Sequence, residues 1–149
     1  MHNSLRKPIE MDLTLSNASS YQLKNTSGSS IFEGCLNAGW KQGPLPSPLE
    51  IELTEIPFKK YDIYVYYGLD EEGHVFDLSI GRESYEIHSS GKTDGFQRWR
   101  GPAAEKSGNY QAFSGLSGKT QIIRAVLDKS HKGKHSWFIS ALQIVERKD

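Results

Sequence analysis

The sequence predicts an all-β protein that folds as a single β-sandwich. Turn-forming residues, among them 14 Gly and 6 Pro, are scattered at short intervals along the 149 residues. Short segments rich in Ile, Val, Tyr and Phe lie between the turns, and no segment keeps a helical period for more than about one turn. Short strands separated by turn residues are typical of sandwiches and barrels. The length fits one domain of ordinary size, so we expect residues 1–149 to form one domain.

The first elements are expected before residue 60. Residues 1–12 mix charges and Met without periodicity, and we expect them either to pair as an edge strand or to fray. Residues 49–53 alternate apolar residues with Glu, which predicts a strand whose inward side chains are Leu49, Ile51 and Leu53. Pro57 ends this strand, and Lys59 and Lys60 form a solvated turn.

The clearest strand is expected at residues 61–67, which read YDIYVYY. A period of two divides its side chains between the two faces of a sheet. The inward face then carries Ile63, Val65 and Tyr67, and the outward face carries Asp62, Tyr64 and Tyr66.

The remaining strands follow the same alternation. Residues 75–80 are expected to turn Phe76, Leu78 and Ile80 inward, and residues 81–84 form a hairpin loop into a strand at 85–88. The last two strands are expected at 120–127 and 136–146. In the final strand Phe138, Leu142 and Ile144 share the inward face.

Composition excludes several classes of protein. Lys plus Arg and Asp plus Glu number 18 each, so the chain lacks the basic surplus of a general nucleic-acid binder. No apolar run approaches the ~20 residues of a membrane span. One cysteine, Cys35, excludes intrachain disulfides and thiolate zinc sites.

The sequence also argues against catalysis, and we expect no enzyme. Cys35 lies in no recognisable nucleophile motif, and a small buried thiol explains it. Residues 114–118 resemble a serine elbow but lack its first Gly. Glu50 and Glu52 share a strand face, yet alternation alone produces such pairs on a solvated face.

Three stretches together resemble a known family. They are residues 56–58 leading into 61–68, residues 78–81, and residues 139–145. These stretches are similar to jelly-roll domains in large secreted and surface proteins of planctomycete-like bacteria, and in outline to the galactose-binding-like family of carbohydrate-binding modules. The resemblance covers the chain from about Leu49 onward. It implies a jelly-roll sandwich of two antiparallel sheets and a non-catalytic accessory role.

The resemblance also raises the expectation of a structural Ca²⁺, because galactose-binding-like modules often carry one. Carboxylates of the kind that Ca²⁺ binds cluster at Asp70, Glu71 and Glu72, with Asp77 nearby. The alternative is a solvated acidic hairpin loop.

A candidate sugar site lies in residues 95–102. Sugar sites combine a flat aromatic platform with hydrogen-bonding side chains, and here Trp99 stands between Arg98 and Arg100 in a glycine-bounded loop. The two guanidinium groups would also suit sulfate or uronate groups. In the alternative interpretation Trp99 is tucked under the loop and both arginines are solvated.

Other aromatic residues extend this hypothesis. Tyr110 and Trp40 are candidate borders of the same ligand-binding surface, although a buried anchor explains Trp40 equally well. Tyr64 and Tyr66 are platforms if their sheet face is an open groove and core if it is covered. The sequence leaves both readings open.

The sequence therefore predicts a non-catalytic carbohydrate-binding module that binds a polysaccharide or oligosaccharide. We expect it to belong to an extracellular polysaccharide-processing or cell-surface protein of a bacterium, beside other modules of a longer parent. Residues 1–149 show no basic region followed by an apolar run, so we expect no signal peptide within them. The alternative is a structural or adhesive β-sandwich whose partner is another protein.

Overall fold

The computed structural model describes residues 11–16, 19–22, 34–37, 48–67, 72–90, 108–127, 134–135 and 138–148. Within these ranges every regular element is a strand and no helix occurs, so there is no helix that could cross a membrane in this part of the chain. The strands are β1 (Asp12–Ser16), β2 (Ser19–Gln22), β3 (Gly34–Asn37), β4 (Leu49–Thr54), β5 (Lys60–Tyr66), β6 (Glu72–Ile80), β7 (Glu83–Ser90), β8 (Tyr110–Ser117), β9 (Gln121–Val126), β10 (Lys134–His135), β11 (Phe138–Ile139) and β12 (Ala141–Glu146).

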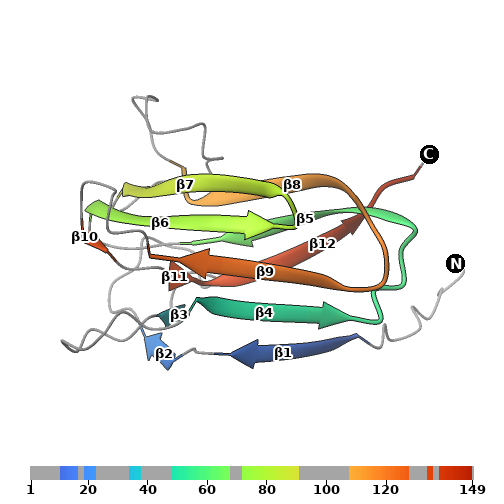
Figure 1. The fold of residues 1–149 in the computed structure, drawn as a ribbon, viewed down its shortest axis with the longest axis horizontal. Coiled ribbons are helices and arrows are strands. Elements are labelled where there is room, and N and C mark those ends of the chain that lie inside the picture. The colour runs from blue at the N-terminus through green and yellow to red at the C-terminus, as the bar shows by residue number, and fades with distance from the viewer. Residues whose placement is uncertain are drawn as a thin grey trace, which may run out of the picture.

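The strands build two antiparallel layers, which overlap in the view of Figure 1. One layer has the order β1-β4-β9-β6, with β7 on β6 and the short β10 parallel to β6. The other contains β12-β5-β8, and the ribbon β11-β3-β2 adjoins it through residue 140, the single residue between β11 and β12. The Ser140 N–H donates to the Tyr66 carbonyl oxygen at 2.8 Å. The predicted all-β sandwich of two antiparallel sheets is confirmed.

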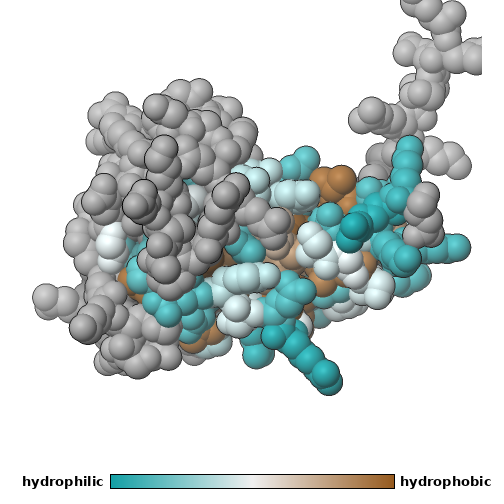
Figure 2. Space-filling view, turned by 90° about the horizontal axis from the view of Figure 1, so that it is seen from above, coloured by the Kyte–Doolittle hydropathy of each residue, from teal (hydrophilic) through white to brown (hydrophobic). Residues whose placement is uncertain are grey.

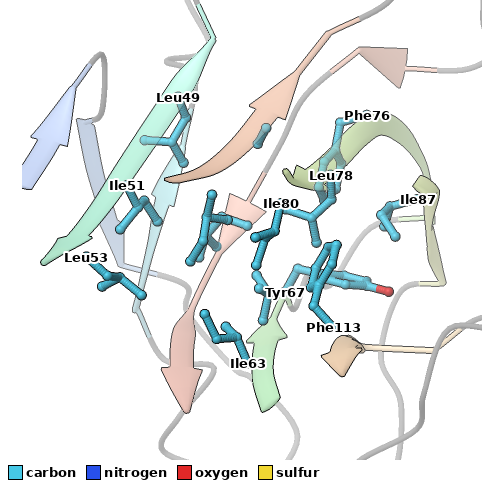
Figure 3. Packing of buried hydrophobic residues seen from close by; sticks show 14 of the residues in the cluster. Leu49, Ile51, Leu53, Ile63, Tyr67, Phe76, Leu78, Ile80, Ile87 and Phe113 are labelled. Atoms are coloured by element: carbon cyan, nitrogen blue, oxygen red, sulfur yellow. The ribbon is translucent and has the colours of Figure 1, made fainter. Parts of the chain in front are cut away.

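The core lies between the two layers, and alternation along each strand fills it (Figure 3). Apolar side chains at every second position are removed from water because each layer covers the inner face of the other. The first layer contributes Leu49, Ile51, Leu53, Phe76, Leu78, Ile80, Ile87, Ile123 and Ala125, and the second contributes Tyr61, Ile63, Val65, Tyr67, Phe113 and Ile139.

The predicted strand faces agree with this core. Ile63 and Val65 are fully buried, and Tyr67 is 4% exposed, whereas the outward Asp62, Tyr64 and Tyr66 are half-buried. Leu142 and Ile144 pack against the core while partly exposed. The Phe138 side chain lies outside the described residues.

The hairpin between β6 and β7 is tighter than expected. Ile80 pairs with Glu83, so the loop is Gly81 and Arg82 alone and β7 begins two residues earlier than predicted. Gly81 has φ of 60°, a value that glycine adopts without steric cost. A glycine at the first central position of a two-residue loop suits the twist of the flanking strands.

The sequence interpretation missed the strand β8. Its sequence, YQAFSGLS, lacks β-branched residues, and Gly115 adopts φ of 72°. The pairing with β5 shifts between Tyr61 and Ile63, so Ser114 and Gly115 together oppose Asp62. This β-bulge needs a glycine and interrupts the pattern by which strands are recognised in sequence.

At the N-terminus, residues 1–10 lie outside the described part of the chain. The edge strand is β1, which starts at Asp12 and pairs with β4. Of residues 1–12, the structure therefore tests only Met11, which precedes the strand, and Asp12, which begins it.

Tyr67 provides a test of the core that depends on pH. Its ring meets Phe76 edge-on, with centroids 5.7 Å apart, and within the described residues its buried hydroxyl has no hydrogen-bond partner. Burial raises the pKa of Tyr67 well above its ordinary value. An unfolded tyrosine ionises near pH 10, so unfolding then releases a proton that the folded protein retains.

We expect the free energy of unfolding to fall as pH rises above about 10, by at most about 1.4 kcal/mol per pH unit for this residue. Tyr67→Phe keeps the ring and removes an unsatisfied hydroxyl, so it should retain stability at pH 7 and flatten the alkaline decline. Urea unfolding between pH 7 and 11 measures both. An equally steep decline in Tyr67→Phe would contradict the assignment.

Candidate functional site

Three tyrosines meet on the outer surface of the β12-β5-β8 sheet, and we call Tyr64, Tyr66 and Tyr110 the tyrosine face. Tyr66 pairs with Tyr110 across β5 and β8, and Tyr64 pairs with Ala112. The Tyr110 ring centroid lies 5.6 Å from that of Tyr66 and 6.1 Å from that of Tyr64. All three side chains are half-buried. Tyr110 is therefore the ring that both others contact.

The strands fix this arrangement. Outward residues of β5 alternate with its core residues, so Tyr64 and Tyr66 stand on the side away from the core. Directly paired residues on neighbouring strands share a face, which places Tyr110 beside Tyr66. Aromatic pairs across strands stabilise a sheet by about 0.2–1 kcal/mol each. The tyrosine face is thus an ordered part of the sheet.

A polar side chain borders the rings on β12. Gln143 pairs with Tyr64, and the Tyr66 hydroxyl donates to Gln143 Oε1 at 2.8 Å. This bond leaves the amide NH₂ of Gln143, which is exposed, as a donor at the edge of the rings. Burial raises the pKa of Tyr66, and the neighbouring Tyr110 and Tyr64 raise it further. The Tyr66 hydroxyl is therefore neutral at physiological pH, and it uses its proton in the hydrogen bond to Gln143.

A charged group lies further along the same surface. The Asp62 Oδ1 atom accepts the Gly115 N–H at 2.8 Å, and Arg147 Nη1 lies 3.8 Å from the same oxygen. The Asp62 side chain is only 17% exposed, whereas Arg147 is 53% exposed. The bulge at Gly115 turns its N–H toward the carboxylate, so β8 holds Asp62 in place.

One of the predicted ligand residues belongs to this surface. The structure places Tyr110 on the tyrosine face, where it joins the pair that the sequence left open between platform and core. Trp99, Arg98, Arg100 and Trp40 lie outside the described residues, so the loop site stays a prediction. Arg147 and Gln143 were not singled out from the sequence, and register across β12 and β5 is the signal that would have found them.

Of the four predicted calcium ligands, only Asp77 has a described side chain. Asp70 and Glu71 lie outside the described residues, as does the side chain of Glu72, which begins β6. Asp77 is five residues further along β6 and faces outward, paired with Glu86. The pairing of β6 with β7 shifts in register between Glu72 and Val75, so β6 is irregular between Glu72 and Asp77.

No group of three or more His, Cys, Asp or Glu side chains among the described residues could hold a metal. The calcium site predicted at Asp70, Glu71, Glu72 and Asp77 therefore stays a prediction.

The candidate catalytic groups fall in ordinary strand positions. Residues 114–117 form the end of β8 with its bulge and Gly118 follows in the turn, so this segment is not a strand-to-helix elbow. Glu50 pairs with Arg124 on the outer face of the other layer. Cys35 lies in β3 opposite Tyr21.

Comparison with known proteins gives structural likeness alone. No family model matches the chain, and no curated protein matches it in sequence. The fold is similar to that of a carbohydrate-binding module, TmCBM61, solved in complex with beta-1,4-galactotriose: the TM-score is 0.50 at 11% identity, over 92% of this chain and 88% of that one. A Paenibacillus xanthan lyase matches 90% of this chain with 15% identity and a TM-score of 0.48, and only 12% of the lyase is covered. The TmCBM61 likeness supports the β-sandwich fold.

Proposed function

We propose that this β-sandwich binds carbohydrate without catalysing a reaction, and that the tyrosine face is its binding surface. One observation carries the proposal: on the side of the sheet away from the core, the rings of Tyr64 and Tyr66 both contact that of Tyr110, with a hydrogen-bonded amide at their edge. Core packing does not account for them, because the core lies on the other side of the same sheet.

The chemistry of this surface suits sugars. Pyranose rings present CH-rich faces that pack on aromatic rings, and their hydroxyl edges hydrogen-bond to amide and hydroxyl groups. The tyrosine rings supply the first kind of contact, and Gln143 with the tyrosine hydroxyls supplies the second. A sheet surface buries fewer ligand groups than an enclosed pocket, so dissociation constants in the micromolar to millimolar range are expected.

The fold adds support without deciding the ligand. TmCBM61, whose structure contains beta-1,4-galactotriose, has a similar sandwich, and a shared fold alone does not transfer a function. In the proposed role the domain holds a larger extracellular or cell-surface bacterial protein near its polysaccharide, beside other modules. Attachment raises the effective concentration of the parent protein at the glycan. A structural Ca²⁺ at Asp70, Glu71, Glu72 and Asp77 is part of the same proposal.

Affinity electrophoresis in gels that contain neutral or acidic polysaccharides tests the function. We expect the folded chain to be retarded by at least one polysaccharide, while a non-binding protein of similar size migrates unchanged. Failure to be retarded by any member of a broad panel would overturn carbohydrate binding.

The same gels separate the two candidate surfaces. Trp99→Ala removes the predicted platform of the 95–102 loop and leaves the tyrosine face intact. If Trp99 contacts the glycan, retardation should be lost while the melting temperature stays nearly unchanged. Unchanged retardation would leave the tyrosine face as the binding surface, and unfolding would place Trp99 in the core.

A further inference from the structure

The outward surface of the β12-β5-β8 sheet carries its charges at one end. Arg147 N–H donates to the Lys60 carbonyl oxygen, and Lys60 pairs with Ser117 of β8. Lys60 and Arg147 therefore lie side by side in one row, on the same face as the tyrosines. Figure 2 shows hydrophilic side chains gathered at the end of the described sandwich where β12 ends in Figure 1.

A continuous strip of outward side chains along β5 connects the tyrosine face with the charged end of this surface. From Tyr66 to Lys60 is about 20 Å of strand, and the residues between them on this face are Tyr64 and Asp62. Across from these, Gln143 and Val145 of β12 are exposed. A glycan chain that follows the strand would pass from the rings to the cations.

Asp62 lies beside the Arg147 guanidinium and leaves part of that group exposed to a ligand anion. Asp62 is largely buried and held by the Gly115 N–H, and the guanidinium beside it is half exposed. A guanidinium has five N–H donors in a planar fork, so contact with one carboxylate oxygen leaves donors for a second anion. Asp62 is also the only acidic residue among the described outward residues of this sheet. A ligand anion would thus meet the half-exposed guanidinium of Arg147, whose Asp62 neighbour is already hydrogen-bonded to Gly115.

We propose that this strip selects acidic polysaccharides: sugar rings stack on the tyrosine face, and a carboxylate or sulfate group of the same chain binds at Arg147 and Lys60. The inference rests on the proposed function, because it assumes that the tyrosine face binds glycan. It adds the class of the ligand. Arginine is well suited to the task, since it grips planar carboxylates and sulfates through two parallel hydrogen bonds.

The test compares three polymers: polygalacturonate, a sulfated galactan and a neutral galactan. We expect the folded chain to bind at least one acidic polymer more tightly than the neutral one, and Arg147→Gln to lower that preference about two- to fivefold, as befits a solvent-exposed ion pair. Arg147→Lys, which keeps the charge without the fork, should restore part of it.

Arg124→Gln is the matched control. Arg124 is 55% exposed, close to the 53% of Arg147, and it too lies beside a carboxylate, but on the outer face of the other layer. Both variants lose one positive charge. If both lower the preference for the acidic polymer equally, the polymer is attracted to the net charge of the protein and not to Arg147, and the proposal is overturned.

Salt provides a second readout that needs no variant. Raising ionic strength from about 0.01 M to about 1 M shortens the screening length from about 30 to about 3 Å, so the preference for the acidic polymer should shrink. Retardation by the neutral galactan without any acidic preference would overturn this inference and leave the proposed function standing. Absence of binding to all three and to a wider panel would overturn both.

Discussion

Leu78→Ala should lower the free energy of unfolding by about 2–5 kcal/mol, the range for emptying a leucine-sized site in a packed core. Leu78 is fully buried on the central strand β6, paired with Tyr85 of β7 and Ala125 of β9. Strands on both sides restrict relaxation into the cavity, so most of the cost should remain. Because domains are stable by only about 5–15 kcal/mol, the variant could lose much of its folded population on mild heating. Urea unfolding measures the change.

Ile122→Ala serves as the comparison for the core. Ile122 lies on β9 beside the buried Ile123 but points outward and is 40% exposed. Its truncation should cost well under half as much as that of Leu78, since less apolar surface returns to water. Equal losses in the two variants would mean that the faces of the sheet are assigned wrongly.

Tyr110→Thr should weaken glycan binding about five- to thirtyfold, which corresponds to a loss of about 1–2 kcal/mol. Tyr110 contacts both other rings of the tyrosine face, so its removal takes away one platform and leaves Tyr64 and Tyr66 without their common neighbour. Threonine is favoured in strands, so β8 should keep its pairing with β5. Isothermal titration or affinity electrophoresis with the retained polysaccharide measures the loss.

Ile122→Thr is the control for the ring substitution. It places the same residue type on an outward strand position of the other layer, where no tyrosine cluster exists among the described residues. Binding should be unchanged in this variant, and both variants should remain folded at the assay temperature. Wild-type affinity in folded Tyr110→Thr would remove the tyrosine face as the binding surface.

The two predictions concern the core between the layers and the outer face of one layer, and the strand β5 belongs to both. In β5 the inward Ile63 and Val65 anchor the strand in the core, which holds the outward Tyr64 and Tyr66 in fixed positions. A binding surface on strands needs little ordering when a ligand arrives, so less of the contact energy is lost to immobilising side chains.

The sequence by itself determined the fold class and much of the core. Leu49, Ile51, Ile63, Val65 and Leu78 could be assigned inward because alternation with a period of two is a local property of a strand with one covered face. It also separated Tyr64 and Tyr66 from the core residues of the same strand.

The tertiary structure alone decided which distant residues share a surface. Tyr110 joins Tyr66 through the register of β8, a strand whose pattern a glycine bulge hides. Arg147 reaches Asp62 across 85 positions of sequence because β12 returns beside β5. Pairing between strands depends on turns, bulges and the packing of the whole sandwich, and a period of two along one segment carries no information about its neighbour. The register of β8 and β12 against β5 therefore determines which residues form the candidate site.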